Sequence, residues 1–191
     1  MKINTFPLVA LAFLSCYILN SCNGVSENRE DKNKVSEKIY SCLPCGQSCD
    51  TFKYPKAGNC IRCNMALVSA STIIHKNIEP YEMCSLNETQ TVFLDVRTAA
   101  EFNGTATEKY GAIKNAINIP VQELESRLNE LEMFKEKDIV VYCSHSHRSP
   151  RASHMLTQNG FKNVTNMNAG MSEWSVLVRD SVCNEKLFRQ Q

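Results

Sequence analysis

The sequence predicts an α/β fold with a mostly parallel sheet and flanking helices, preceded by a small N-terminal cysteine-rich unit. Apolar, β-branched runs such as residues 92–96 and 139–142 alternate in the second half with segments whose apolar residues recur at helical spacing. Strands that alternate with helices are typical of a parallel sheet with right-handed crossovers. Before these runs lie two Cys-x2-Cys pairs, Cys42 with Cys45 and Cys60 with Cys63.

The composition is that of a globular protein. The chain has 191 residues, of which 43% are hydrophobic, and a formal net charge of +1. This length allows one packed domain of ordinary size and a smaller unit. The balanced charge argues against a nucleic-acid partner.

Residues 1–21 are predicted to be a signal peptide. Lys2 is followed by a mostly apolar run over residues 6–19, which is short for a membrane span and typical of the apolar region of a signal peptide. The run ends at Leu19-Asn20-Ser21-Cys22, which resembles a bacterial lipobox and implies a lipid on Cys22. The alternative is an ordinary cleaved signal peptide without lipid.

Residues 22–39 are predicted to be a lipidated tether. They are polar and charged, and they lack any apolar period. Multiple acyl chains on Cys22 would bind the chain stably to a membrane. Asn23, rather than aspartate, follows Cys22, and by resemblance to the proteobacterial sorting rule this favours the outer membrane. We therefore expect a protein of the bacterial cell envelope, on the periplasmic face of the outer membrane.

Residues 40–69 form a predicted cysteine module. The two Cys-x2-Cys pairs are fourteen residues apart, which is zinc-ribbon spacing. A unit this short buries too little apolar surface to fold alone, so a metal or disulfides must stabilise it. The predicted metal ligands are Cys42, Cys45, Cys60 and Cys63.

The identity of the ion stays open at this point. Four thiolates suit zinc, whereas thiolates with a thioether such as that of Met65 suit monovalent copper. Cys49 is a fifth thiol in the module. Paired disulfides are the alternative, because an envelope protein lies in an oxidising space.

The cysteine module resembles the short heavy-metal-binding module of bacterial copper and silver efflux proteins. The resemblance rests on its opening at Tyr40-Ser41-Cys42 and on its close over residues 58–68. It implies a metal site. The module departs from that pattern at Pro44 and Cys45, where a Met-His pair is common, and at Asn64, where glycine is common.

The second domain is predicted over residues 73–178, after a linker at 69–77 and before a C-terminal tail at 179–191. Cys84 is interpreted as a packing residue, His154 as a surface residue and Trp174 as part of the core. The expected strands are 92–96, 117–119, 139–142 and 164–167. The expected helices are 78–86, 121–131, 150–159 and one around residue 174.

The loop over residues 143–149 is the predicted active site. It begins with Cys143 at the end of the strand 139–142, and it ends at Ser149-Pro150, a hydroxyl cap followed by a proline. Loop N–H groups and the helix N-terminus would both favour negative charge at the Cys143 sulfur, and the thiolate is the reactive form of cysteine. The alternative is a buried structural cysteine.

The spacing Cys143-x4-Arg148 resembles the active-site loop of the rhodanese family of sulfurtransferases, whereas protein tyrosine phosphatases use a loop one residue longer. Further segments resemble that family in the same order along the chain. They are residues 93–98 with 101–102, residues 111–120, residues 160–164, and residues 169–171 with Trp174.

This resemblance implies a rhodanese fold and a persulfide on Cys143, and it implies that sulfur transfer needs no cofactor. The donor would be thiosulfate or a persulfide, and the acceptor a thiol or cyanide. Asp95 would tie neighbouring loops together and Arg97 would be structural. The substrate-binding residues would be Ser144, His145, Ser146, His147, Arg148 and Ser149. His145 and His147 would supply a proton or bind anions, or else be solvated.

Two departures from the family concern the substrate. Many rhodaneses have glycine at the position of Ser146, so serine implies a different local conformation or some strain. Residues 104–110 replace a shorter turn.

Two other functions remain open from the sequence. In one, the chain is a membrane-anchored metal-binding protein that uses the cysteine module, and the rhodanese fold is a non-catalytic docking module. In the other, it is a thiol-disulfide or arsenate reductase, which needs a second cysteine such as Cys84 or Cys183. Cys183 would resolve the persulfide, or it is simply a cysteine of the tail.

Overall fold

The computed structural model describes residues 38–45, 47–178 and 181–190. The predicted signal peptide, the lipid site at Cys22 and all but the last two residues of the tether lie outside the described residues, so they stay predictions. The described residues all belong to the unit Ser36–Gln191. In the described part, no helix has the length and apolar character that crossing a membrane requires.

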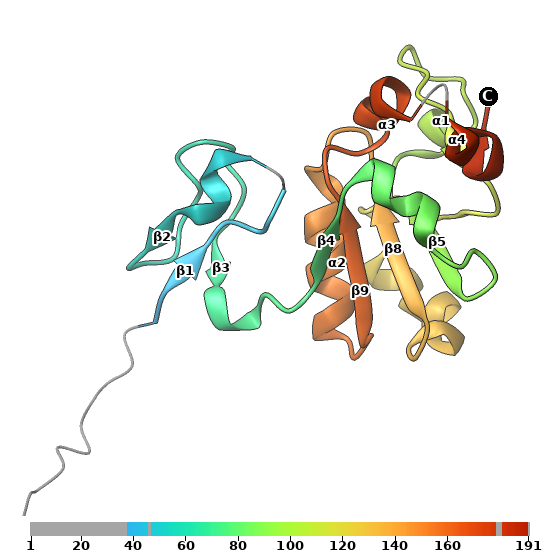
Figure 1. The fold of residues 1–191 in the computed structure, drawn as a ribbon. Coiled ribbons are helices and arrows are strands. Elements are labelled where there is room, and N and C mark those ends of the chain that lie inside the picture. Colours follow the sequence, from blue (N-terminus) through green and yellow to red (C-terminus); the bar gives the residue numbers. More distant parts are fainter. Residues whose placement is uncertain (1–37, 46, 179–180, 191) are drawn as a thin grey trace, which may run out of the picture. The chain divides into compact units, whose positions relative to one another are not determined.

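The cysteine module is built on a small antiparallel sheet with the strand order β2-β1-β3. A short 3₁₀ helix, η1, lies between its first two strands (Figure 1). Cysteine side chains form most of its buried interior. The elements are β1 (Tyr40–Ser41), η1 (Ser48–Thr51), β2 (Lys53–Tyr54) and β3 (Val68–Ser69).

The second domain contains a five-stranded sheet in the order β4-β9-β8-β5-β7, and every pair in it is parallel. The predicted mostly parallel sheet is confirmed. Figure 1 shows β8 between β9 and β5, so the strand that leads into Cys143 is supported on both sides. The strands are β4 (Lys76–Ile78), β5 (Thr91–Asp95), β7 (Ile117–Asn118), β8 (Asp138–Tyr142) and β9 (Asn163–Met167).

The sheet has a buried core on each face. Side chains alternate along β8, so Ile139 and Val141 enter one core, while Val140 and Tyr142 enter the other. The first core includes residues of α2 (Arg148–Gln158) and packs against η4 (Glu125–Phe134). The second includes residues of η3 (Pro80–Ser85), α3 (Met171–Leu177) and α4 (Val182–Leu187), and Trp174 is fully buried in it as predicted.

Several element predictions need correction. Helices were expected over residues 78–86 and 121–131, and helices do form there, but with shifted bounds and as the 3₁₀ helices η3 and η4. The expected linker, residues 69–77, ends inside β4, which pairs with β9. His154 is half-buried rather than a surface residue. Nearby His75 is buried, and burial, with a smaller contribution from His154, lowers the pKa of His75 to about 4.

The end of the chain is bound to the domain by a disulfide. Cys84, interpreted from the sequence as a packing residue, forms a disulfide with Cys183 of α4. After α4, the strand β10 (Phe188–Arg189) pairs antiparallel with β6 (Ala112–Ile113). The expected tail therefore forms secondary structure, and Cys183 is not a free thiol.

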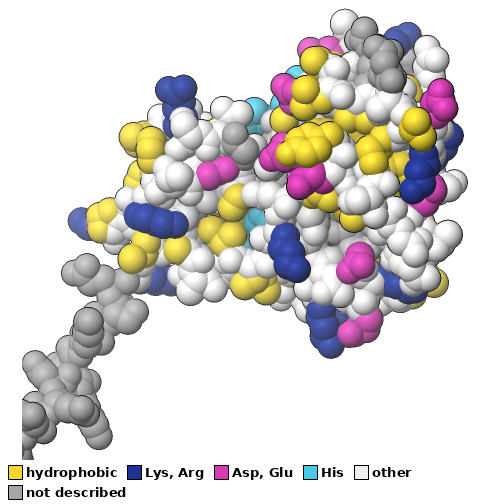
Figure 2. Space-filling view, viewed as in Figure 1, with side chains coloured by type: hydrophobic (Ala, Val, Ile, Leu, Met, Phe, Trp, Pro, Cys, Tyr) yellow, Lys and Arg dark blue, Asp and Glu magenta, His cyan; other side chains and the backbone are white. Residues whose placement is uncertain are grey.

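Asp95, the last residue of β5, forms a fully buried ion pair with Arg97. The Arg97 guanidinium donates to the Asp95 carboxylate at 2.6 Å and to the carbonyl of Gly111 at 2.8 Å. The predicted structural role of Arg97 is confirmed. The Asp95 carboxylate orients Arg97, and it is Arg97 that reaches the neighbouring segment at Gly111. On the face shown in Figure 2, basic and acidic side chains are interspersed.

Candidate functional site

Cys143 follows the last residue of β8, at the carboxyl end of the sheet. In parallel sheets, ligands bind in the crevice beyond this end. Its side chain is enclosed, with the residue only 1% exposed. Its sulfur lies 3.4 Å from the hydroxyl oxygen of Ser149, which is also buried. The loop therefore surrounds the thiol rather than presenting it to bulk solvent.

The helix after the loop begins earlier than the sequence predicted. α2 begins at Arg148, with His147 as the residue before it, so Ser149 lies inside the first turn and is not the cap. Its hydroxyl contacts the Cys143 sulfur instead. The thiol thus lies beside the first turn of α2, where unpaired N–H groups favour negative charge.

The start of α3 holds the backbone of the active-site loop. The N–H of Met171 donates to the carbonyl of Cys143 at 2.9 Å, and the N–H of Ser172 donates to the carbonyl of Ser144 at 3.0 Å. Gly170 precedes them with φ of 72°. A Cβ atom on Gly170 would lie 2.5 Å from the Cys143 carbonyl oxygen, so only glycine permits this approach.

Glu101 clamps the two ends of the loop. The guanidinium of Arg148 donates to both carboxylate oxygens of Glu101 at 2.7 Å, and the hydroxyl of Ser144 donates to the same group at 2.8 Å. The hydrogen bonds from Arg148, more than any other contact, hold the pKa of Glu101 well below its usual range. Arg148 therefore organises the loop, and its paired donors are already used by a carboxylate.

Glu101 is a functional residue that was not predicted from the sequence, where it stands out only within a segment that resembles the rhodanese family. Glu101 is the third residue of the short helix α1 (Ala99–Phe102) and forms a capping box with Thr98, in which each side chain bonds the other residue's backbone N–H. The Thr-x-x-Glu pattern at residues 98–101 was a readable sign of that helix start. Nothing in the pattern indicated that the same carboxylate also binds Arg148.

Ser146 keeps the backbone conformation that glycine favours. The sequence left two options for Ser146: a different local conformation, or strain. Its φ of 53° excludes the first, because Ser146 keeps the left-handed conformation and carries the strain of a non-glycine residue there. Its buried hydroxyl donates to the carbonyl of Met167 at 3.4 Å and accepts from the Asn166 side chain at 3.3 Å. These two contacts bind the tip of the loop to β9.

The histidines of the loop are exposed. The Nε2 atom of His145 lies 3.3 Å from the hydroxyl oxygen of Tyr110, and the two rings meet edge to face with centroids 5.4 Å apart. Tyr110 is the last residue of the segment 104–110, which replaces a shorter turn of the rhodanese family. That segment therefore contacts the active-site loop directly.

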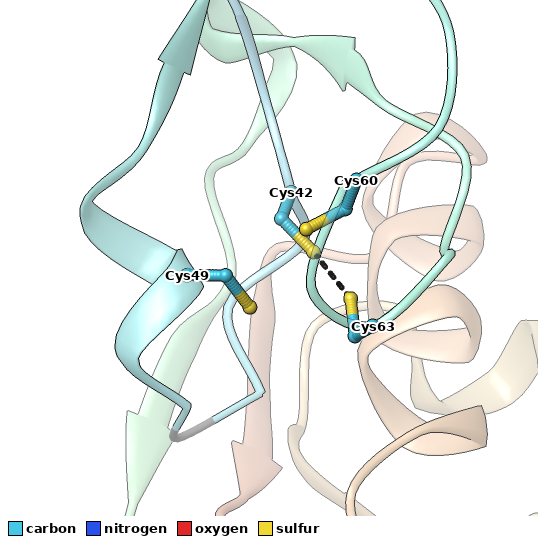
Figure 3. Close-up of side chains that lie close together, drawn as sticks. All are labelled: Cys42, Cys49, Cys60 and Cys63. Carbon is cyan, nitrogen blue, oxygen red and sulfur yellow. Dashed lines mark hydrogen bonds between the residues drawn. The ribbon is translucent and has the colours of Figure 1, made fainter.

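The cysteine module gathers four thiols, but not the four that spacing predicted. The sulfur atoms of Cys42, Cys49, Cys60 and Cys63 all lie within 4.8 Å of one another. Figure 3 shows their side chains pointing toward a common centre. The sulfur of Cys45 lies instead 3.4 Å from a carboxylate oxygen of Asp50. We call Cys42, Cys49, Cys60 and Cys63 the thiol cluster.

A tight turn places Cys60 and Cys63 in the thiol cluster. The N–H of Asn64 donates to the carbonyl of Cys60, and Asn64 adopts φ of 58° where glycine was the expected residue. Burial opposes ionisation of Cys60, but the N–H groups of Cys63 and Arg62 and the hydroxyl of Tyr54 outweigh it and lower its pKa to about 6. Burial raises the pKa of Cys49 to about 11.

The fold and the loop define an α/β domain with an enclosed thiol at the carboxyl end of its sheet, and comparison with known proteins identifies its family. Residues 81–177 match the family described as Rhodanese-like domain. The match covers half of the chain, so the chain belongs to the rhodanese-like domain family.

Individual relatives match over the same domain. The chain is 38% identical over 96 residues to the "Putative thiosulfate sulfurtransferase, mitochondrial" of Schizosaccharomyces pombe. The match covers 44% of this chain and 63% of that protein. It is 32% identical over 94 residues to a tRNA uridine(34) hydroxylase of Yersinia enterocolitica. This match covers 47% of this chain and 25% of that protein. The chain thus spans less than two thirds of these relatives.

Among solved structures, a rhodanese-related protein from Thermoplasma volcanium is 29% identical, with a TM-score of 0.46. The comparison covers 56% of this chain and 95% of that one.

We expect the substitution Glu101→Gln to loosen the loop in a pH-dependent way. Hydrogen bonds to charged groups contribute about 1.5–3 kcal/mol, so we expect a loss of about 2 kcal/mol of unfolding free energy at pH 7. Because the pKa of Glu101 is lowered on folding, its contribution is full above the unfolded pKa of about 4.3 and is lost as pH falls toward the folded pKa. The difference between wild type and variant should therefore shrink below about pH 4.

Denaturant unfolding at pH 7, 5, 4 and 3 measures this effect. Glu125→Gln is the matched control, since Glu125 is exposed, and it should change stability by less than about 0.5 kcal/mol. A Glu101→Gln loss that is equal at pH 7 and pH 3 would contradict the role given to the ionised clamp.

Proposed function

We propose that the chain is a sulfurtransferase that carries sulfane sulfur as a persulfide on Cys143. One observation carries this proposal: an enclosed thiol at the carboxyl end of the central strand, within a loop whose two ends are held by Glu101. Membership of the rhodanese-like family and the name of the fission-yeast relative support it.

In the first step, the Cys143 thiolate attacks the outer sulfur of thiosulfate. A bond forms between the two sulfur atoms, the sulfur–sulfur bond of the donor breaks, and sulfite leaves with the bonding electron pair. Cys143 then carries a persulfide anion. In a persulfide donor the same attack releases a thiolate.

The loop is suited to hold the charge of that persulfide. The Ser149 hydroxyl lies beside the thiol, and the first turn of α2 directs its N–H groups toward the loop. Glu101 and the start of α3 fix the loop in advance, so little reorganisation is needed when the charge moves to the outer sulfur. The enclosure of Cys143 favours small donors over bulky ones.

In the second step, an acceptor takes the outer sulfur. A thiolate or cyanide attacks it, the sulfur–sulfur bond of the persulfide breaks, and the electron pair returns to Cys143 as thiolate. Cyanide would leave as thiocyanate, and a thiol acceptor as a persulfide. No net oxidant or reductant is consumed in the cycle.

Intact-mass spectrometry after incubation with thiosulfate tests the proposal. The wild-type chain should gain the mass of one sulfur atom and lose it again when cyanide is added. Cys143→Ser should gain none, whereas Cys45→Ser, which removes another buried thiol, should gain one. Absence of the adduct from wild type, with thiosulfate and with a small persulfide donor, would make the rhodanese fold a docking module.

A further inference from the structure

The thiol cluster is the strongest chemical feature outside the active-site loop. Its members come from three separate segments: Cys42 follows β1, Cys49 lies in η1, and Cys60 and Cys63 lie on either side of one turn. Three of the four are fully or almost fully buried, with exposures of 1% for Cys42, 0% for Cys49 and 2% for Cys60. Such convergence of separate segments on one centre indicates a shared ligand.

The module has little else to hold it together. The buried apolar residues of the module are Cys42, Leu43, Cys45, Cys49, Cys60, Met65 and Leu67, so most of them are cysteines. Its strands are two residues long. Burial of so few apolar side chains does not offset the conformational entropy of a unit this size, so a further stabilising ligand or bond is required.

The geometry of the thiol cluster fits a tetrahedral ion. Zinc–sulfur bonds of about 2.3 Å place tetrahedral sulfur atoms about 3.8 Å apart. The sulfur atoms in the cluster lie within 4.8 Å of one another, and those of Cys42 and Cys63 are 3.2 Å apart. Small side-chain movements therefore convert the arrangement into a coordination shell.

We propose that Cys42, Cys49, Cys60 and Cys63 bind one zinc ion, with Cys49 rather than Cys45 as the fourth ligand. Four thiolate donors suit zinc, and a buried four-ligand shell is typical of a closed, structural site. On binding, each of the four cysteines bonds to zinc through its sulfur as a thiolate, and those still protonated release their proton to solvent. No oxidation or reduction takes place.

Cys45 lies next to this site without belonging to the proposed shell. Its backbone N–H and its thiol both contact the carboxylate of Asp50, at 2.9 Å and 3.4 Å. The Cys45 sulfur groups with Cys49 and Asp50, and it is not one of the four sulfur atoms that all lie within 4.8 Å of one another. Cys45 and Cys49 are thus a matched pair of buried cysteines with different expected roles.

Zinc binding by the full chain, purified in detergent, tests the proposal. Native mass spectrometry of wild type should show one zinc ion, and a chelator-competition titration should give its affinity. Cys49→Ser should weaken zinc binding by more than about 100-fold, beyond the 10- to 100-fold typical of an outer-shell partner. Cys45→Ser should change it by less than about 10-fold.

A second measurement does not depend on how well the variants fold. Cobalt added to the wild-type chain should give the absorption of a tetrahedral tetrathiolate, with proton release and protection of four cysteines from alkylation. Three results would overturn the proposal: zinc loss in Cys45→Ser but not in Cys49→Ser, no zinc bound by wild type, or two disulfides among the cluster cysteines in the purified chain.

Discussion

Gly170→Ala is expected to disable the active-site loop while leaving its chemical groups intact. The new Cβ atom would lie 2.5 Å from the Cys143 carbonyl oxygen and 2.6 Å from that of Ser144, and both are backbone atoms. This clash is relieved only if the active-site loop moves away from the start of α3. The hydrogen bonds from Met171 and Ser172 to these two carbonyls would then be lost.

Both the stability and the rate of sulfur transfer should fall. At φ 72° and ψ −160°, Gly170 has a backbone conformation that is essentially restricted to glycine. An alanine there costs about 1–3 kcal/mol and overpacking about 1–3 kcal/mol, so we expect a total loss of about 2–6 kcal/mol. A displacement of about 1 Å at the nucleophile typically costs about 100-fold in rate. Denaturant unfolding and the rate of thiosulfate-dependent thiocyanate formation measure the two effects.

Gly160→Ala separates the clash from the backbone strain. Gly160 also has a positive φ, of 86°, but a Cβ atom there would meet nothing within 4 Å. This control should lose only about 1–2 kcal/mol and keep its rate. Equal effects of the two substitutions on the rate would show that the close approach at Gly170 does not position Cys143.

Removal of the Cys84–Cys183 disulfide is expected to be the largest single loss of stability. The bond joins residues 99 positions apart. In the chain-entropy description, opening a loop of about that length costs about 4–5 kcal/mol. α4 and β10 should detach first, because this bond holds them near η3.

Denaturant unfolding of Cys84→Ala, Cys183→Ala and the double variant measures the effect. Each single substitution should cost nearly as much as the double one, because each breaks the same bond. Additive, small losses would contradict a formed disulfide. Sulfur loading of Cys143 should persist in the double variant at low temperature, whereas a dithiol reductase using Cys183 would lose activity.

The parts of the fold that local patterns encode were predictable. The β-branched runs around residues 92–96 and 139–142 form β5 and β8, and the parallel sheet follows from their alternation with helices. Cys143 at the strand end followed from the same reasoning. The exact start of α2 did not, because Ser149 has the chemistry of a cap but uses its hydroxyl on the thiol.

The contacts that complete both sites lie far apart in the sequence. Glu101 is 43 positions from Ser144 and 47 from Arg148, so no local pattern reports the clamp. The disulfide partners are also distant. In the cysteine module, the Cys-x2-Cys spacing favoured Cys45, but η1 places Cys49 in the cluster instead. Such arrangements depend on tertiary folding rather than on spacing.

The outermost strands of the five-stranded sheet bear on self-association. The edge strands are β4, with three residues, and β7, with two. An edge strand offers unpaired backbone groups to other chains, and a short edge offers few of them. Pro120 follows β7 closely and has no N–H to donate. Both edges of the sheet therefore offer few free backbone groups, which disfavours edge-to-edge pairing between copies.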